Sequence, residues 1–115
     1  MEVQLFSGAT FLGIVDSKII DESMGVVGGL LEPSNAYCKD FQLFFRVHTE
    51  SADWNKLAQL ELKATLASGE VLNCGGGICA TDVEMFPEVS IEFCGLDLHI
   101  MDLFRKKDGL EPRYP

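Results

Sequence analysis

SNAYCKDFQLFFRVH, residues 34–48, is the stretch that decides the fold, because it is a long helix-like segment set between segments that resemble strands. Aromatic side chains recur through it at spacings of three and four: Tyr37, Phe41, Phe44, Phe45 and His48. This spacing is typical of one face of an amphipathic helix, and Ser34 is suited to cap its N-terminus. The pattern predicts a helix of about 14 residues whose aromatic side lies across a sheet.

The residues before this helix have the pattern of strands. Val3 and Leu5 alternate with polar residues, and after the break at Ser7-Gly8 the pattern resumes, so residues 2–16 are predicted to form a hairpin. Residues 16–23 are more polar and indicate a connection or a short irregular strand. The apolar segment 24–31 predicts a third strand, largely buried, in which glycines mark a bulge or a close approach of another backbone.

Strand patterns return after the helix. Residues 60–66 alternate clearly, residues 71–74 and 89–93 complete the predicted strands, and residues 98–104 fit either a strand or a helix. Residues 53–57 favour a short second helical turn. Strands on both sides of a helix indicate the α+β class: an antiparallel sheet of about five to six strands with one main amphipathic helix packed on one face. We expect a single domain over 1–104 and a flexible C-terminal tail over 105–115.

Charge is the most distinctive property of the composition. The 115 residues include 18 acidic and 9 basic side chains, for a net charge of −9. Such a chain is poorly suited to nucleic acid or to an anionic membrane, because both require basic surface. No apolar run is long enough to span a membrane, and Glu2 and the lack of basic residues nearby do not fit a secretory signal. We therefore expect a cytoplasmic protein.

The four cysteines are Cys38, Cys74, Cys79 and Cys94. In a reducing compartment they are expected to be free thiols that pack as small apolar groups. Their spacing does not provide the two close pairs of a typical structural zinc site, so we predict no metal and no other cofactor. Nucleophilic catalysis would need a histidine beside a thiol, and neither His48 nor His99 stands in a recognisable catalytic motif, so no catalytic residue is predicted.

Glycines and carboxylates offer two further candidates for chemistry. The glycines of 25–29 and 75–77 do not open a helix and have no adjacent lysine, so turns and bulges are favoured over phosphate binding. Close carboxylate pairs occur at 21–22, at Asp82 with Glu84, and at Asp97 with Asp102. None has the spacing of a calcium loop, and a solvated surface is the favoured interpretation.

One segment carries a family resemblance. Met24-Gly25-Val26, Gly28 or Gly29, Pro33 and Tyr37 together resemble the MGV-x-G-x-x-x-P-x-x-x-Y segment of a group of small bacterial proteins of unassigned function. The resemblance covers most of residues 1–95, and it departs from the group in the cysteines and in the run of three glycines at 75–77. It implies the same order of three strands, a helix and further strands, and it implies no activity.

These observations favour a non-enzymatic, acidic protein-binding module of a bacterium, such as an immunity-type protein that neutralises a basic partner. Its candidate partner surface consists of Asp21, Glu22, Glu84 and Glu88. One alternative is a small enzyme or ligand-binding domain with a pocket between helix and sheet, lined by Tyr37, His48, Trp54 and the thiols. Another is a homo-oligomeric structural subunit that hides apolar surface at 24–31 and 96–104, since the mean hydropathy is +0.14.

Overall fold

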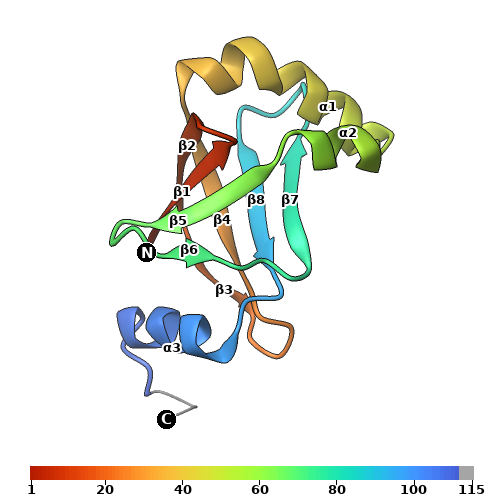
Figure 1. Ribbon diagram of the computed structural model, residues 1–115. Coiled ribbons are helices and arrows are strands. Elements are labelled where there is room, and N and C mark those ends of the chain that lie inside the picture. Colours follow the sequence, from red (N-terminus) through yellow and green to blue (C-terminus); the bar gives the residue numbers. More distant parts are fainter. Residues whose placement is uncertain (112–115) are drawn as a thin grey trace.

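A curled antiparallel sheet forms the framework of the chain in the computed structural model, which describes residues 1–111 (Figure 1). Its eight strands are β1 (Glu2–Ser7), β2 (Thr10–Asp16), β3 (Lys18–Asp21), β4 (Val26–Pro33), β5 (Leu62–Leu66), β6 (Val71–Leu72), β7 (Gly77–Asp82) and β8 (Val89–Cys94). The order across the sheet is β6-β5-β1-β2-β4-β8-β7, with β3 also paired to β4. The α+β class and the antiparallel pairing are thus confirmed.

The third strand pairs with β4 in the same register as the second. Gly13 of β2 lies opposite Pro33, and Lys18 of β3 lies opposite Gly28. The step from Gly13 to Lys18 is as long as the step from Gly28 to Pro33 on β4, so the register does not change between β2 and β3. β2 and β3 therefore act as one long strand that is interrupted at Ser17. At this interruption Gly29 is required, because a Cβ there would lie 2.2 Å from the carbonyl oxygen of Asp16.

The sheet is larger than the five to six strands that the sequence predicts. Residues 18–21 form β3, a short strand with a register shift, so of the two alternatives for this segment the short irregular strand is correct. Residues 77–82 form β7, which alternates half-buried Ile78 and Ala80 with exposed Cys79 and Thr81. The run of three glycines at 75–77 obscured this strand, because glycines suggest a turn and only five residues of the new strand follow them.

The predicted long helix is divided into shorter pieces. Ser34 does cap its start, accepting a hydrogen bond from the Tyr37 N–H at 3.1 Å. A π-helical turn, η1 (Tyr37–Phe41), then precedes α1 (Gln42–Glu50), and α2 (Trp54–Gln59) follows after an extended Ser51. The expected main helix is therefore present but less regular than predicted, because a π-helical turn interrupts it, and the short helical turn expected at 53–57 forms α2. We call residues 37–59 the helical cap.

The second helical region lies at the opposite end of the molecule from the cap (Figure 1). α3 (Leu98–Lys107) begins at Asp97, whose side chain accepts a hydrogen bond from the Ile100 N–H at 2.9 Å. This resolves the ambiguous segment 98–104 as helix, and the helix also contains residues 105–107, the first three of the expected tail. Residues 112–115 of that tail lie outside the described residues.

A single apolar core runs between these two ends inside the curl of the sheet. It includes Tyr37 and Phe45 from the cap, Phe93 from β8, and Met101 and Phe104 from α3, each at most 2% exposed. The aromatic side of the predicted helix thus fills one end of the core, and residues of the sheet and of α3 fill the rest. Within residues 1–111, no helix has the length and apolar character needed to cross a membrane.

Candidate functional site

A buried carboxylate attaches the helical cap to the sheet. Asp82, the last residue of β7, is 1% exposed and accepts three hydrogen bonds from the cap. The Tyr37 hydroxyl donates to Oδ2 at 2.7 Å, Gln42 Nε2 donates to Oδ2 at 3.2 Å, and Arg46 Nε donates to Oδ1 at 3.1 Å. Because the buried charge is paired and well supplied with donors, it holds α1 in place on β7.

The backbone of Asp82 takes part in the same attachment. Its N–H donates to Thr49 Oγ1 at 3.1 Å, and the Thr49 hydroxyl donates to the Phe45 carbonyl oxygen at 2.7 Å. Burial, and then the hydrogen bond to Asp82, raise the pKa of Tyr37 well above its usual range, so this phenol stays protonated. The sequence had suggested that Asp82 and Glu84 form a solvated pair. That interpretation is wrong for Asp82, which is an internal anchor.

The hydrogen bond from Asp82 to Thr49 also defines the free edge of β7. It shows that the N–H of Asp82 points away from β8, and backbone groups alternate in direction along an antiparallel strand. The N–H and C=O groups of Ile78 and Ala80 therefore point away from β8 as well. β7 ends the strand order, and within the described part of the chain no strand pairs with this edge.

Two adjoining hollows run along this edge, and we call them together the β7 groove. The upper hollow, of about 240 Å³, lies between the cap and β7 and is bordered by His48, Trp54 and Ala80. The lower one, of about 180 Å³, is bordered by Leu62, Leu72 and Cys74 from the opposite side of the curl. Leu57 and Ile78 border both hollows, so the two adjoin each other.

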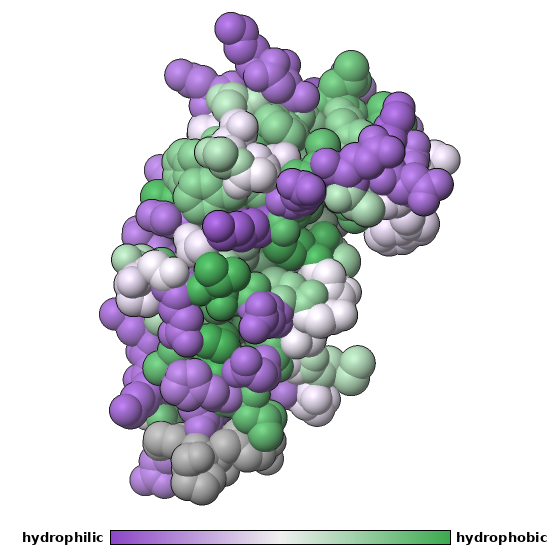
Figure 2. All heavy atoms as spheres, in the orientation of Figure 1, coloured by the Kyte–Doolittle hydropathy of each residue, from purple (hydrophilic) through white to green (hydrophobic). Residues whose placement is uncertain are grey.

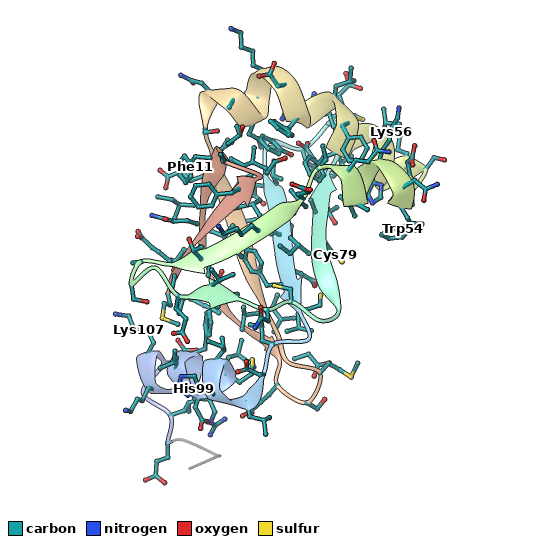
Figure 3. The ribbon with its side chains drawn as sticks, viewed as in Figure 1. Phe11, Trp54, Lys56, Cys79, His99 and Lys107 are labelled. Carbon is teal, nitrogen blue, oxygen red and sulfur yellow. The ribbon has the colours of Figure 1, made fainter. Side chains whose placement is uncertain are left out.

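The upper wall of the groove is built from aromatic rings. His48 is 8% exposed, and its Nδ1 accepts a hydrogen bond from the Asp53 N–H at 2.9 Å, which fixes the link between α1 and α2. Trp54 packs edge-on against His48, with ring centroids 4.9 Å apart, yet 66% of its surface is exposed. Figure 3 shows Trp54 hanging from α2 on the same side of the molecule as Cys79 of β7. Figure 2 shows hydrophobic side chains beneath this overhanging part of the cap.

The predicted pocket between helix and sheet is thus present in reduced form. His48 and Trp54 line it as expected, together with Cys79 in the upper hollow and Cys74 in the lower one. Tyr37 does not, because its hydroxyl is bound to Asp82. Each hollow is smaller than the roughly 300 Å³ at which small-molecule pockets begin. Two small hollows beside an unpaired strand edge are better suited to single side chains of an extended chain.

The four candidate acidic residues do not form one surface. Asp21 and Glu22 lie at the turn between β3 and β4, near α3, whereas Glu84 and Glu88 lie in the loop between β7 and β8, near the cap (Figure 1). The molecule measures 42 Å along its longest axis, and the two pairs occupy its opposite ends.

At the β3–β4 turn the carboxylates also have internal partners. Arg105 forms an ion pair with Glu22. Asp21 accepts hydrogen bonds from the Ser23 hydroxyl and the Met24 N–H, which lower its pKa. The Asp21-Glu22 pair therefore contributes to the turn and to the contact with α3.

A larger hollow lies away from the groove. It measures about 880 Å³ and is bordered by Met1, Leu66, Leu103 and the lysines 106 and 107. It is a wide depression between the start of β1, the β5–β6 turn and α3. The N-terminal ammonium group beside it is already bound to the Ser17 carbonyl oxygen at 2.8 Å and to Asp16 at 3.4 Å. We therefore place the candidate site at the groove, where unpaired backbone and aromatic side chains coincide.

All four cysteines are free thiols. Among residues 1–111, no group of three or more histidine, cysteine or acidic side chains is arranged to hold a metal ion. Asp97, another candidate carboxylate, is the cap of α3. Comparison with known proteins adds no assignment, since no family model, curated protein or solved structure matches this chain.

Proposed function

We propose that the protein is a non-enzymatic protein-binding module that holds an extended, basic segment of its partner in the β7 groove. The observation that carries this proposal is the free edge of β7, where the N–H and C=O groups of Ile78 and Ala80 point away from the sheet. An unpaired strand edge binds another extended backbone by completing its hydrogen bonds. The neighbouring hollows then receive alternate side chains of the added strand.

The charge of the chain supports a basic partner. A net charge of −9 attracts a cationic segment and disfavours acidic competitors, mainly by increasing the rate of association. Exposed Trp54 at the mouth of the groove supplies an aromatic face for a lysine or arginine side chain. An immunity-type protein that neutralises a basic toxin is the specific form of this proposal that we favour.

The single tryptophan of the chain makes the proposal directly measurable. Trp54 fluorescence is titrated with short peptides in which lysine alternates with valine, and with matched peptides in which glutamate replaces lysine. The lysine peptide should change the fluorescence at low salt and bind more weakly at high salt, while the glutamate peptide should have no effect. Equal responses to both peptides, or none to the lysine peptide, would contradict the proposal.

A variant of β7 separates edge pairing from adhesion to the acidic surface. Ala80→Pro removes an N–H that points away from β8, so the β7–β8 ladder keeps its hydrogen bonds and only the free edge is blocked. Ala80→Ser, which retains the N–H, is the matched control. The proline variant should lose peptide binding and the serine variant should keep it. If both variants bind equally, the site is not the strand edge.

The homo-oligomeric alternative also involves this edge, because a second copy of the chain could pair with it. Light scattering at low and high salt distinguishes the two cases. A monomer at both salt concentrations is expected. A stable dimer that Ala80→Pro converts to a monomer would show that the edge is occupied by the chain itself, and would replace the basic partner with a second copy.

A further inference from the structure

Two cysteines share the outward face of the β7–β8 pair. Cys79 lies opposite Glu92, and Cys94 lies opposite Gly77. Side chains two residues apart on a strand point to the same face, so Cys79 and Cys94 are diagonal neighbours on that face. Because Gly77 has no side chain, the position directly opposite Cys94 is left open.

The two thiols are close enough to influence each other. Burial, and then the neighbouring Cys79, raise the pKa of Cys94 to about 11. Cys79 is exposed, whereas Cys94 is partly buried. The pair therefore consists of one accessible thiol and one thiol that is more protected from solvent. Cys38, by contrast, lies apart on the cap beside Asn35 and Lys39.

From this arrangement we propose that Cys79 and Cys94 form a redox-active dithiol that closes to a disulfide by exchange with a small-molecule disulfide such as oxidised glutathione. The Cys79 thiolate attacks one sulfur of oxidised glutathione, which forms a mixed disulfide and releases one glutathione thiolate. Cys94 then gives its proton to solvent, and its thiolate attacks Cys79 Sγ, which releases the second glutathione. Two protein thiols are oxidised, and one glutathione disulfide is reduced to two glutathione molecules.

Closure would covalently join β7 to β8 around the loop 83–88. That loop carries Met85 and Phe86, which are 90% and 64% exposed. The bond would restrict the movement of β7, the edge strand of the sheet. The proposal stands on the cysteine pair alone and does not depend on the proposed function of the groove.

The test is to incubate the reduced, folded protein with oxidised glutathione, block the remaining thiols with N-ethylmaleimide and measure the intact mass. The wild-type protein should lose two hydrogens and two alkylation sites, and peptide mapping should join Cys79 to Cys94. Cys94→Ser should instead accumulate one glutathione on Cys79. A wild-type protein that accumulates glutathione adducts without closing, or that does not react, would overturn the proposal.

The other two cysteines provide matched controls. Cys38→Ser and Cys74→Ser should close as the wild type does, and circular dichroism of each variant confirms that the fold is retained. Cys74 is the important control, because Cys94 also lies close enough to it to contribute to the raised pKa of Cys74. If Cys74→Ser abolishes closure while Cys79→Ser does not, the bond forms between the other pair and the proposed dithiol is wrong.

Discussion

Both ends of the molecule bury aromatic side chains of their helices against the sheet, but the cap also attaches its helix through a buried, hydrogen-bonded charge. At the cap, α1 is attached through the buried Asp82 and its bonds to Tyr37, Gln42 and Arg46. At the other end, α3 buries apolar side chains, including Phe104, and adds the partly buried ion pair of Arg105 with Glu22. Apolar burial stabilises an element wherever it fits, whereas a buried hydrogen-bonded charge permits little displacement. The cap is thus the end built to keep a geometry, and the groove lies directly beneath it.

The largest expected effect is at the apolar end. Phe104→Ala removes a ring that is 1% exposed and should lower the free energy of unfolding by about 4 kcal/mol, because it leaves a cavity between α3 and the sheet. Leu98→Ala, on the same helix but 53% exposed, should cost less than about 0.5 kcal/mol. Urea unfolding of both variants measures the difference. A cost below about 1 kcal/mol for Phe104→Ala would show that α3 contributes little to the core.

The next effect tests the polar end by changing charge without changing size. Asp82→Asn keeps the side-chain volume but places an amide near the Gln42 donor and removes the charge that pairs with Arg46. We expect a loss of about 2 kcal/mol in the free energy of unfolding. Glu84→Gln makes the same chemical change at an exposed site and should be nearly neutral. If the two variants unfold at the same urea concentration, the anchor does not distinguish the cap from α3.

Alkaline pH should destabilise the fold through groups whose pKa is raised. Burial raises the pKa of Cys74 to about 11 from an ordinary value near 9, so the folded state retains a proton that the unfolded chain releases between these values. Stability is therefore full below pH 9 and falls as the pH rises toward 11, by less than about 1 kcal/mol for this partly exposed thiol. Tyr37 adds to the loss at higher pH. The unfolding midpoint is measured at pH 8 and at pH 10 for the wild type and for Cys74→Ala. The decrease between the two pH values should be smaller for the variant.

A smaller effect than that of Asp82→Asn is expected at the ion pair of the α3 end. Glu22→Gln removes the charged partner of Arg105, which should cost roughly 1 kcal/mol at low salt and slightly less at high salt, because the pair is partly buried but still reached by solvent. The comparison of the two ends requires this value to be below that of Asp82→Asn. Thermal unfolding at two salt concentrations measures it, and a cost that does not depend on salt would mean that the pair acts through packing.

The elements that could be predicted from the sequence are those with a clear periodicity. Ser34 was identified as a helix cap, and the alternation of residues 60–66 and 89–93 located β5 and β8. The strand at 77–82 was missed because glycines precede it and its pattern is short. The π-turn at 37–41 was missed because spacings of three and four occur equally in a regular helix.

The candidate site was harder to predict, because its parts come from distant segments. His48 and Trp54 were named as pocket residues from their chemical type, and both border the groove. Asp82 could not be distinguished from seventeen other acidic residues, since its burial depends on contacts with residues 36 to 45 positions earlier. The free edge of β7 has no signal in one sequence, because strand order is a property of the assembled sheet.

The long strand formed by β2 and β3 has a consequence for how the chain reaches its fold. It pairs with β4 around the local turn at 22–25, as β1 pairs with β2 and β7 pairs with β8 along consecutive segments. Such hairpins form within microseconds, because little chain must be ordered to bring their strands together. Joining β1 to β5 and β4 to β8 brings together strands that are separated in sequence by the whole cap and further residues. Folding speed should therefore be set by these two closures, with the hairpins already in place when they occur.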